Sequence, residues 1–101
     1  MLDAAGFPAE AARLAAALGL DYSVDSMSKV QAWLTSARTD GNALLAGCYA
    51  GEVVRREVGG TWQGDGTITG LGHVSVTMPL AKANAGEDLV AYVDEVLRYA
   101  R

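Results

Sequence analysis

The sequence GCYAGEVVRREVGGTW, from Gly47 to Trp62, gives the strongest indication of the fold. The helical pattern around it covers residues 42–58 and stops at Gly59-Gly60. This expected helix is apolar on nearly all sides, which is typical of a helix at the centre of a domain. Gly47 and Gly51 lie one turn apart, and each costs about 1 kcal/mol relative to alanine. Because such a cost is tolerated where another backbone approaches closely, we expect a neighbouring helix or strand to pack against these glycines.

The charged residues of this helix lie close to its small residues. At about 100° per residue, Arg55 faces the same side as Gly51, with Glu52 alongside. Glu52 is one turn from both Arg55 and Arg56, a spacing at which helical side chains pair. An unpaired charge on a buried face would be very unfavourable, so we predict a semi-buried ion pair that fixes the helix against the sheet.

A second interpretation of the same residues is a binding pocket. Tyr49, Glu52 and Arg55 would line it, and Arg55 would face the ligand. Trp62 could stack on a ligand as well, although its apolar neighbours favour a place in the core. The candidate binding residues are therefore Tyr49, Glu52, Arg55 and Trp62.

Two helices are expected before the central one. The first covers about residues 8–18, with Pro8 in its first turn and Gly19 after its end. The second begins after Ser23, a candidate N-cap, and carries apolar residues at helical spacing as far as Ala37.

After the central helix the pattern changes to that of a small antiparallel β-meander. Residues 61–63 and 67–69 are short and β-prone. Residues 73–78 alternate with period two, and Pro79 ends that strand. The alternation puts three apolar residues on one face: Val74, Val76 and Met78.

A last helix is expected from about Gly86 to Ala100. The fold class is therefore α+β, and residues 1–101 form a single domain. Its N-terminal helices surround a central glycine-containing helix, and a small antiparallel β-meander leads to a C-terminal helix packed on the sheet.

Composition limits the function classes. The chain has 101 residues, a formal net charge of −4 and a pI near 4.7. This charge argues against binding to nucleic acid or to anionic membranes, because phosphates would be repelled. No apolar run is long enough to span a bilayer, and no signal peptide is evident. The single cysteine, Cys48, fits a reducing compartment, so we expect a cytoplasmic protein.

Residues with catalytic or ligating chemistry are few. His73 is the only histidine and Cys48 the only cysteine, so a zinc site lacks ligands. No nucleophile–base arrangement or phosphate loop is recognisable. We therefore expect no enzymatic activity, no catalytic residues, no metal and no cofactor.

The pattern Gly-x-Tyr-x-Gly-Glu-x-x-Arg-Arg, followed by Gly-Gly-x-Trp, resembles that of a family of small bacterial domains of unknown function. Some members of that family are found near toxin and secretion loci. The similarity extends over most of the chain from Leu20 onward, and includes Leu20-Asp21-Tyr22-Ser23 and the tail after Pro79. The resemblance implies a fold more than an activity.

Three hypotheses for function follow. The first is a protein-interaction module, an immunity or adaptor protein that binds and occludes a basic protein partner. It rests on the missing catalytic groups, the acidic charge and the resemblance. The alternative is a small-molecule-binding domain with a pocket at Tyr49, Glu52 and Arg55. The third is a homo-oligomer that uses an exposed sheet edge.

Overall fold

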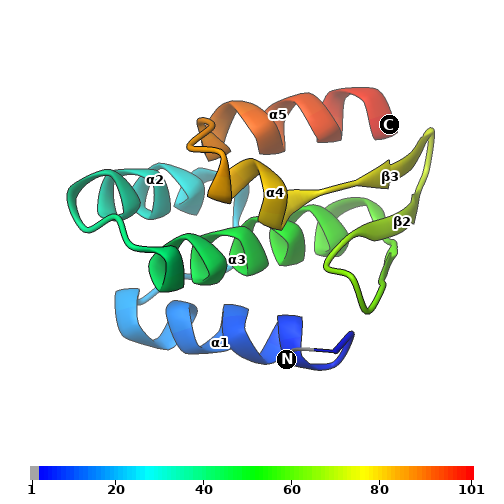
Figure 1. Ribbon diagram of the computed structural model, residues 1–101. Coiled ribbons are helices and arrows are strands. Elements are labelled where there is room, and N and C mark those ends of the chain that lie inside the picture. The colour runs from blue at the N-terminus through cyan, green and yellow to red at the C-terminus, as the bar shows by residue number, and fades with distance from the viewer. Residues whose placement is uncertain (1–2) are drawn as a thin grey trace.

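A computed structural model describes residues 3–101. Along this range five α-helices, one 3-10 helix and three strands follow one another (Figure 1). Their bounds are α1 Gly6–Leu18, η1 Val24–Ser26, α2 Met27–Ser36, α3 Asp40–Val58, β1 Thr61–Trp62, β2 Ile68–Leu71, β3 Val74–Thr77, α4 Pro79–Asn84 and α5 Leu89–Ala100. The predicted α+β class, with a central helix, an antiparallel meander and a C-terminal helix, is confirmed.

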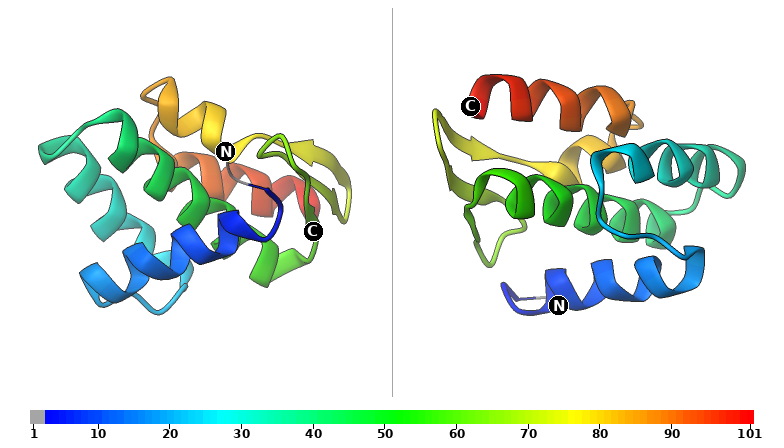
Figure 2. Two further views of the ribbon diagram at one scale, coloured as in Figure 1. Left: turned by 60° about the horizontal axis from the view of Figure 1, so that its bottom comes forward. Right: turned by 180° about the vertical axis from the view of Figure 1, so that it is seen from behind.

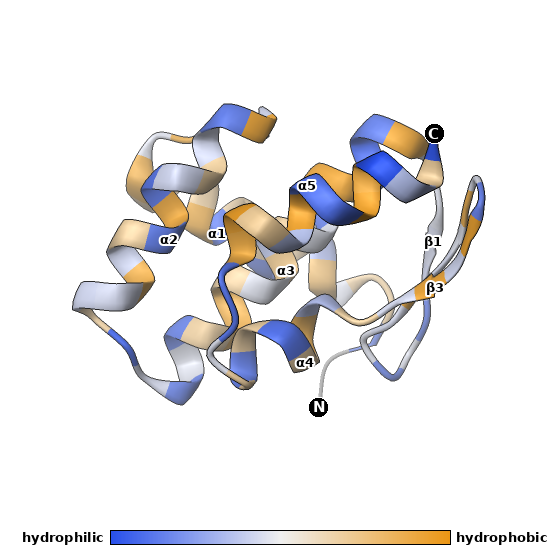
Figure 3. Cartoon of the chain, turned by 90° about the horizontal axis from the view of Figure 1, so that it is seen from above, coloured by the Kyte–Doolittle hydropathy of each residue, from blue (hydrophilic) through white to orange (hydrophobic). Residues whose placement is uncertain are grey.

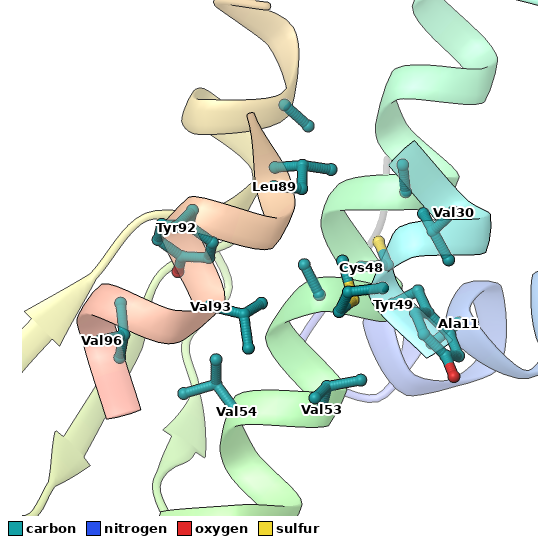
Figure 4. Close-up of a cluster of buried hydrophobic side chains, with 14 of the residues drawn as sticks. Ala11, Val30, Cys48, Tyr49, Val53, Val54, Leu89, Tyr92, Val93 and Val96 are labelled. Atoms are coloured by element: carbon teal, nitrogen blue, oxygen red, sulfur yellow. The ribbon is translucent and has the colours of Figure 1, made fainter. Parts of the chain in front are cut away.

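Helix α3 is the centre of the fold. It lies between α1 on one side and α5 on the other, and both views of Figure 2 keep this order. Every residue from Ala46 to Val54 is buried, whichever side of the helix it occupies. In Figure 4, Val54 points toward Val93 on α5, whereas Tyr49 points away from α5, toward α1 and α2. The expected buried helix is therefore confirmed.

The two glycines of α3 admit two different neighbours. A Cβ added at Gly47 would lie 3.0 Å from the Cα of Leu80 in α4. One added at Gly51 would strike the indole ring of Trp62 in β1 and lie 3.0 Å from Cδ1 of Ile68 in β2. The contact with Trp62 is too short for a real Cβ, so the sheet can pack this closely only against glycine, and at Gly47 an added Cβ would force α4 to move by a few tenths of an ångström.

The sheet has the order β1-β2-β3, and both pairings are antiparallel. Its register puts Trp62, Ile68 and Thr77 in one cross-strand row, and all three are buried. The opposite row faces outward and ends at Val76, which is 49% exposed.

Only one end of the apolar face of β3 reaches the core, where Val74 packs against it. Val76 and Met78 are half-exposed, whereas Thr77 is buried and its hydroxyl shares a hydrogen bond of 2.6 Å with Tyr92 Oη. The physical reason is the register, which a two-residue turn at Gly72-His73 fixes between Leu71 and Val74. The period-two pattern identified the strand but gave no reason to expect a threonine inside.

Helix α4 was not expected from the sequence. Pro79 ends the strand as predicted, but it also occupies the first turn of a six-residue helix. The predicted helix starts also move. Helix α1 begins at Gly6, and the residues after Ser23 first form η1, so α2 begins at Met27. Helix α3 begins at Asp40, where Thr39 Oγ1 accepts a hydrogen bond from the Asn42 N–H at 3.0 Å. Helix α5 begins at Leu89, behind an Asp88 N-cap.

Within residues 3–101, none of the helices combines the length and the apolar character needed to cross a membrane.

The glycine packing predicts a position-dependent effect of alanine within one helix. Gly51→Ala should lower the free energy of unfolding by about 1–3 kcal/mol, because the added methyl group must displace Trp62. Gly41→Ala is the matched control, since a Cβ there meets only Thr39 Oγ1 at 3.9 Å. That variant should be neutral or more stable by up to about 1 kcal/mol. Urea denaturation checks both, and equal effects at the two positions would contradict the packing.

Candidate functional site

The carboxylate of Glu52 is buried and fully partnered. The residue is 1% exposed. Arg55 donates two hydrogen bonds to it, from Nε to Oε2 at 2.5 Å and from Nη2 to Oε1 at 3.0 Å. Trp62 Nε1 donates a third to Oε2 at 2.9 Å, and Arg56 Nε lies 3.8 Å from Oε1. The predicted ion pair is confirmed, and the bond from Trp62 ties it to the sheet.

Local sequence explains how Trp62 reaches this carboxylate. Helix α3 ends at Gly59, and Gly59 and Gly60 have φ values of 87° and 115°. These left-handed conformations turn the chain back toward α3 at little cost for glycine. Trp62 then lies over Gly51, which has no side chain in the way. The indole is also held from the other side by Phe7, whose ring centroid is 4.9 Å away.

The electrostatics keep Glu52 ionised. Burial on its own raises the pKa of a carboxyl, but the hydrogen bonds from Arg55 and Trp62 and the charges of both arginines outweigh it. The pKa of Glu52 therefore lies below its usual value of 4.5. The same contact raises the pKa of Arg55. The charges of Glu52 and Arg55 therefore stabilise each other within the fold.

Tyr49 lies on a different side of α3 and is fully buried. Its hydroxyl shares a hydrogen bond of 2.6 Å with Ser26 Oγ and accepts one of 2.8 Å from the backbone N–H of Tyr22. The rings of Tyr22 and Tyr49 stack with centroids 5.1 Å apart. Arg56 lies 3.6 Å over the Tyr22 ring, so it links Tyr49 to Glu52 through contacts inside the protein.

The structure thus brings Glu52, Arg55 and Trp62 together and places Tyr49 apart from them. Arg55 and Trp62 line an open hollow of about 470 Å³ beside the start of α1. Neither Tyr49 nor Glu52 lines it. The four candidate residues therefore do not form one pocket, and of the four only Arg55 reaches the surface, since Trp62 borders the hollow but is 5% exposed.

Sequence reasoning missed a second hollow, the groove between β3 and α5, which has a volume of about 450 Å³. Its apolar lining includes Val74, Val76, Val96 and Tyr99. Its charged lining consists of Lys82, Glu87, Asp88 and Glu95. We call this hollow the β3–α5 groove. In Figure 3, hydrophobic segments of β3 lie beside α5, which carries hydrophilic residues at intervals.

Two signals in the sequence pointed toward this groove. The apolar alternation of residues 73–78 was recognised, but its outward orientation depends on the register. Tyr99 lies off the buried stripe of α5 and is 63% exposed, which is unusual for so large a side chain. An aromatic residue outside the apolar stripe of a terminal helix was therefore a usable signal.

Other reactive groups do not form a site. Burial, with smaller contributions from the charges of Glu10 and Glu52, raises the pKa of Cys48 to about 12, so its thiol stays protonated at neutral pH. His73 is exposed in the turn between β2 and β3. Across residues 3–101, no three side chains of His, Cys, Asp or Glu are grouped so that they could hold a metal ion.

No protein-family model, curated protein or solved structure matches this chain. Its function must therefore be inferred from its own residues.

The buried carboxylate predicts a specific pH dependence. Because the folded-state pKa of Glu52 is lowered, its contribution is present above pH 4.5 and is lost as the pH falls through the folded pKa. Glu52→Gln should lower the free energy of unfolding at neutral pH by about 1–3 kcal/mol. The difference from the unmodified chain should shrink toward acid pH.

Glu57→Gln is the control for this experiment. Glu57 lies on the same helix and pairs with Arg101, but it is 36% exposed in its side chain. Its loss should change the free energy of unfolding by no more than about 1 kcal/mol. Chemical denaturation over a pH series would reject the assignment if both variants had the same pH profile.

Proposed function

We propose that this chain is a protein-interaction module that binds a basic partner protein and occludes part of its surface. The observation that carries the proposal is the β3–α5 groove, an apolar hollow with acidic side chains on the surface of an acidic chain. Val76 and Tyr99, which line it, are 49% and 63% exposed. Large apolar side chains that gather at one hollow are typical of interaction surfaces.

Charge supports a basic partner. Glu87, Asp88 and Glu95 line the groove, and Lys82 is the single basic residue among its lining residues. Lys82 Nζ lies 3.4 Å from Glu87 Oε2, so these two charges offset each other, whereas Glu95 and Asp88, which caps α5, leave the groove acidic. Together with the net charge of −4, this surface would attract a basic protein and speed its capture.

The biological setting is part of the same proposal. The resemblance to small bacterial domains near toxin and secretion loci supports an immunity or adaptor role. Cys48, a single buried cysteine, supports a reducing compartment such as the cytoplasm. Occlusion by binding needs no catalytic group, which fits the scarcity of reactive side chains on this surface.

The small-molecule alternative has a narrower basis. Arg55 keeps 35% of its side chain exposed and lines the hollow beside Trp62. A ligand there would have to compete with Glu52, which already holds two of the guanidinium nitrogens. The β3–α5 groove carries no such internal competitor for its apolar residues, so protein binding is the better supported function.

An affinity-capture experiment tests the proposal with matched variants. The chain, a Val76→Ser/Tyr99→Ser variant and a Leu44→Ser control would be immobilised and exposed to lysate of the native cell. Leu44 is 36% exposed on α3 and lies outside the groove, so its variant should retain the same polypeptides. The groove variant should lose them.

The retained polypeptide would be identified, purified and titrated against each chain. We expect it to be basic, to bind the groove variant at least about tenfold more weakly, and to bind more weakly at high salt. Circular dichroism would establish that all three chains are folded. Capture that is equal for all three chains, or confined to acidic polypeptides, would overturn the proposal.

A further inference from the structure

We propose that the partner is recognised through an extended segment that adds to the free edge of β3 as a fourth strand, with basic side chains facing α5 and apolar side chains facing outward. This inference rests on the proposed function and names the form in which the β3–α5 groove takes its partner.

The first observation is the unpaired edge. In the part of the chain that the structure describes, β3 pairs with β2 on one side and with no strand on the other. A strand edge presents a row of backbone donors and acceptors that another extended chain can pair with. Figure 3 looks down on this edge, and β3 lies beside α5 with no other segment drawn over it.

The second observation is that the groove runs along this edge. Its walls are Val74, Val76 and Thr77 from β3 and one face of α5 from Ala91 to Tyr99, with Asp88 at the N-cap of that helix. The N–H of His73 donates to Ala100 O at 3.1 Å, so the end of α5 is fixed at the β2–β3 turn. The two walls therefore flank the space beside β3, where an added strand would lie.

The third observation concerns the floor. Thr77 and Tyr92 bond to each other there, and burial raises the pKa of Tyr92 to about 12, so its hydroxyl stays neutral. Among residues 3–101, no buried side-chain nitrogen or oxygen lacks a hydrogen-bond partner. The floor therefore offers no unsatisfied polar group to a small ligand, and recognition falls to the strand edge and the charged wall.

The register of the sheet sets the side-chain pattern of the segment. Thr77 is in the inward row and contacts α5, whereas Val76 is in the outward row. Since successive side chains of a strand alternate between faces, inward ones would meet Glu95 on α5 and Asp88 at its N-cap. Outward ones would pack beside Val76. The expected motif is thus an alternation of basic and apolar residues.

A second copy of this chain fits the edge less well. Two copies joined through β3 would bring their Glu87, Asp88 and Glu95 side chains together. Each copy also carries a net charge of −4. Like charges brought together at a strand pairing are destabilising, so a basic segment is favoured over self-association.

Synthetic peptides provide the test. The probe is acetyl-(Lys-Val)₄-amide. One control has the same composition in two blocks, Lys₄Val₄, and a second is the alternating peptide with N-methyl groups on every second amide. Binding would be measured by NMR titration of the full chain, with backbone assignments. Because β-addition needs both backbone donors and the alternation, we expect each control to bind at least about tenfold more weakly.

Two protein variants complete the design. The double variant Glu87→Gln/Glu95→Gln should bind the alternating peptide at least about fivefold more weakly, because it removes two carboxylate charges that face the lysine side chains of the peptide. Asp94→Asn should leave binding unchanged, since Asp94 lies on α5 outside the groove and pairs with Arg98. The largest chemical-shift changes of backbone amides should occur in residues 74–77 and on the groove face of α5.

The outcomes separate this inference from the proposed function. If the captured partner binds through the groove but the alternating peptide binds no better than its block and N-methylated controls, strand addition is wrong and the interaction module stands. If the alternating peptide changes the chemical shifts of residues elsewhere on the chain and not those of β3, strand addition is also wrong. If light scattering shows a dimer that the groove charges do not weaken, a second copy occupies the edge and the inference is overturned.

Discussion

The buried carboxylate of Glu52 constrains the rest of this structure. A charge that is 1% exposed is tolerated only with strong partners, and here Arg55 and Trp62 supply three hydrogen bonds while Arg56 adds its charge. Trp62 can reach it only because Gly51 leaves the surface of α3 bare. The need to satisfy one carboxylate therefore fixes where the sheet begins and how closely it approaches the central helix.

Much of this centre was predictable because it depends on short separations along the chain. Glu52 and Arg55 are three residues apart, and glycines at one-turn spacing mark close packing in any helix. The ends of α1 and α3 followed from glycines in the same way. Helix α4 escaped prediction because its six residues form no periodic pattern, and its packing depends on Gly47, more than thirty residues earlier.

The candidate site was harder to predict for the same reason. The helical spacing that grouped Tyr49 with Glu52 and Arg55 says nothing about which neighbour covers each side of a helix buried all round. In the structure η1 covers Tyr49, while β1 covers Glu52. The β3–α5 groove depends on the register that turns Thr77 inward and leaves Val76 outside. No local pattern encodes that choice, so the apolar strand was visible in the sequence but its exposed face was not.

The buried ion pair of α3 and the β3–α5 groove have different roles. The charges of α3 stabilise the centre, whereas the β3–α5 groove keeps an excess of acidic charge at the surface, beside the edge of β3 that no described strand covers. A double-mutant cycle on Glu52→Gln and Trp62→Phe tests the central claim most directly. We expect the two changes to be coupled by about 1–2 kcal/mol in the free energy of unfolding, because Trp62→Phe removes the indole donor and Glu52→Gln takes the negative charge from the acceptor of the same buried hydrogen bond. Effects that add to within about 0.5 kcal/mol would contradict it.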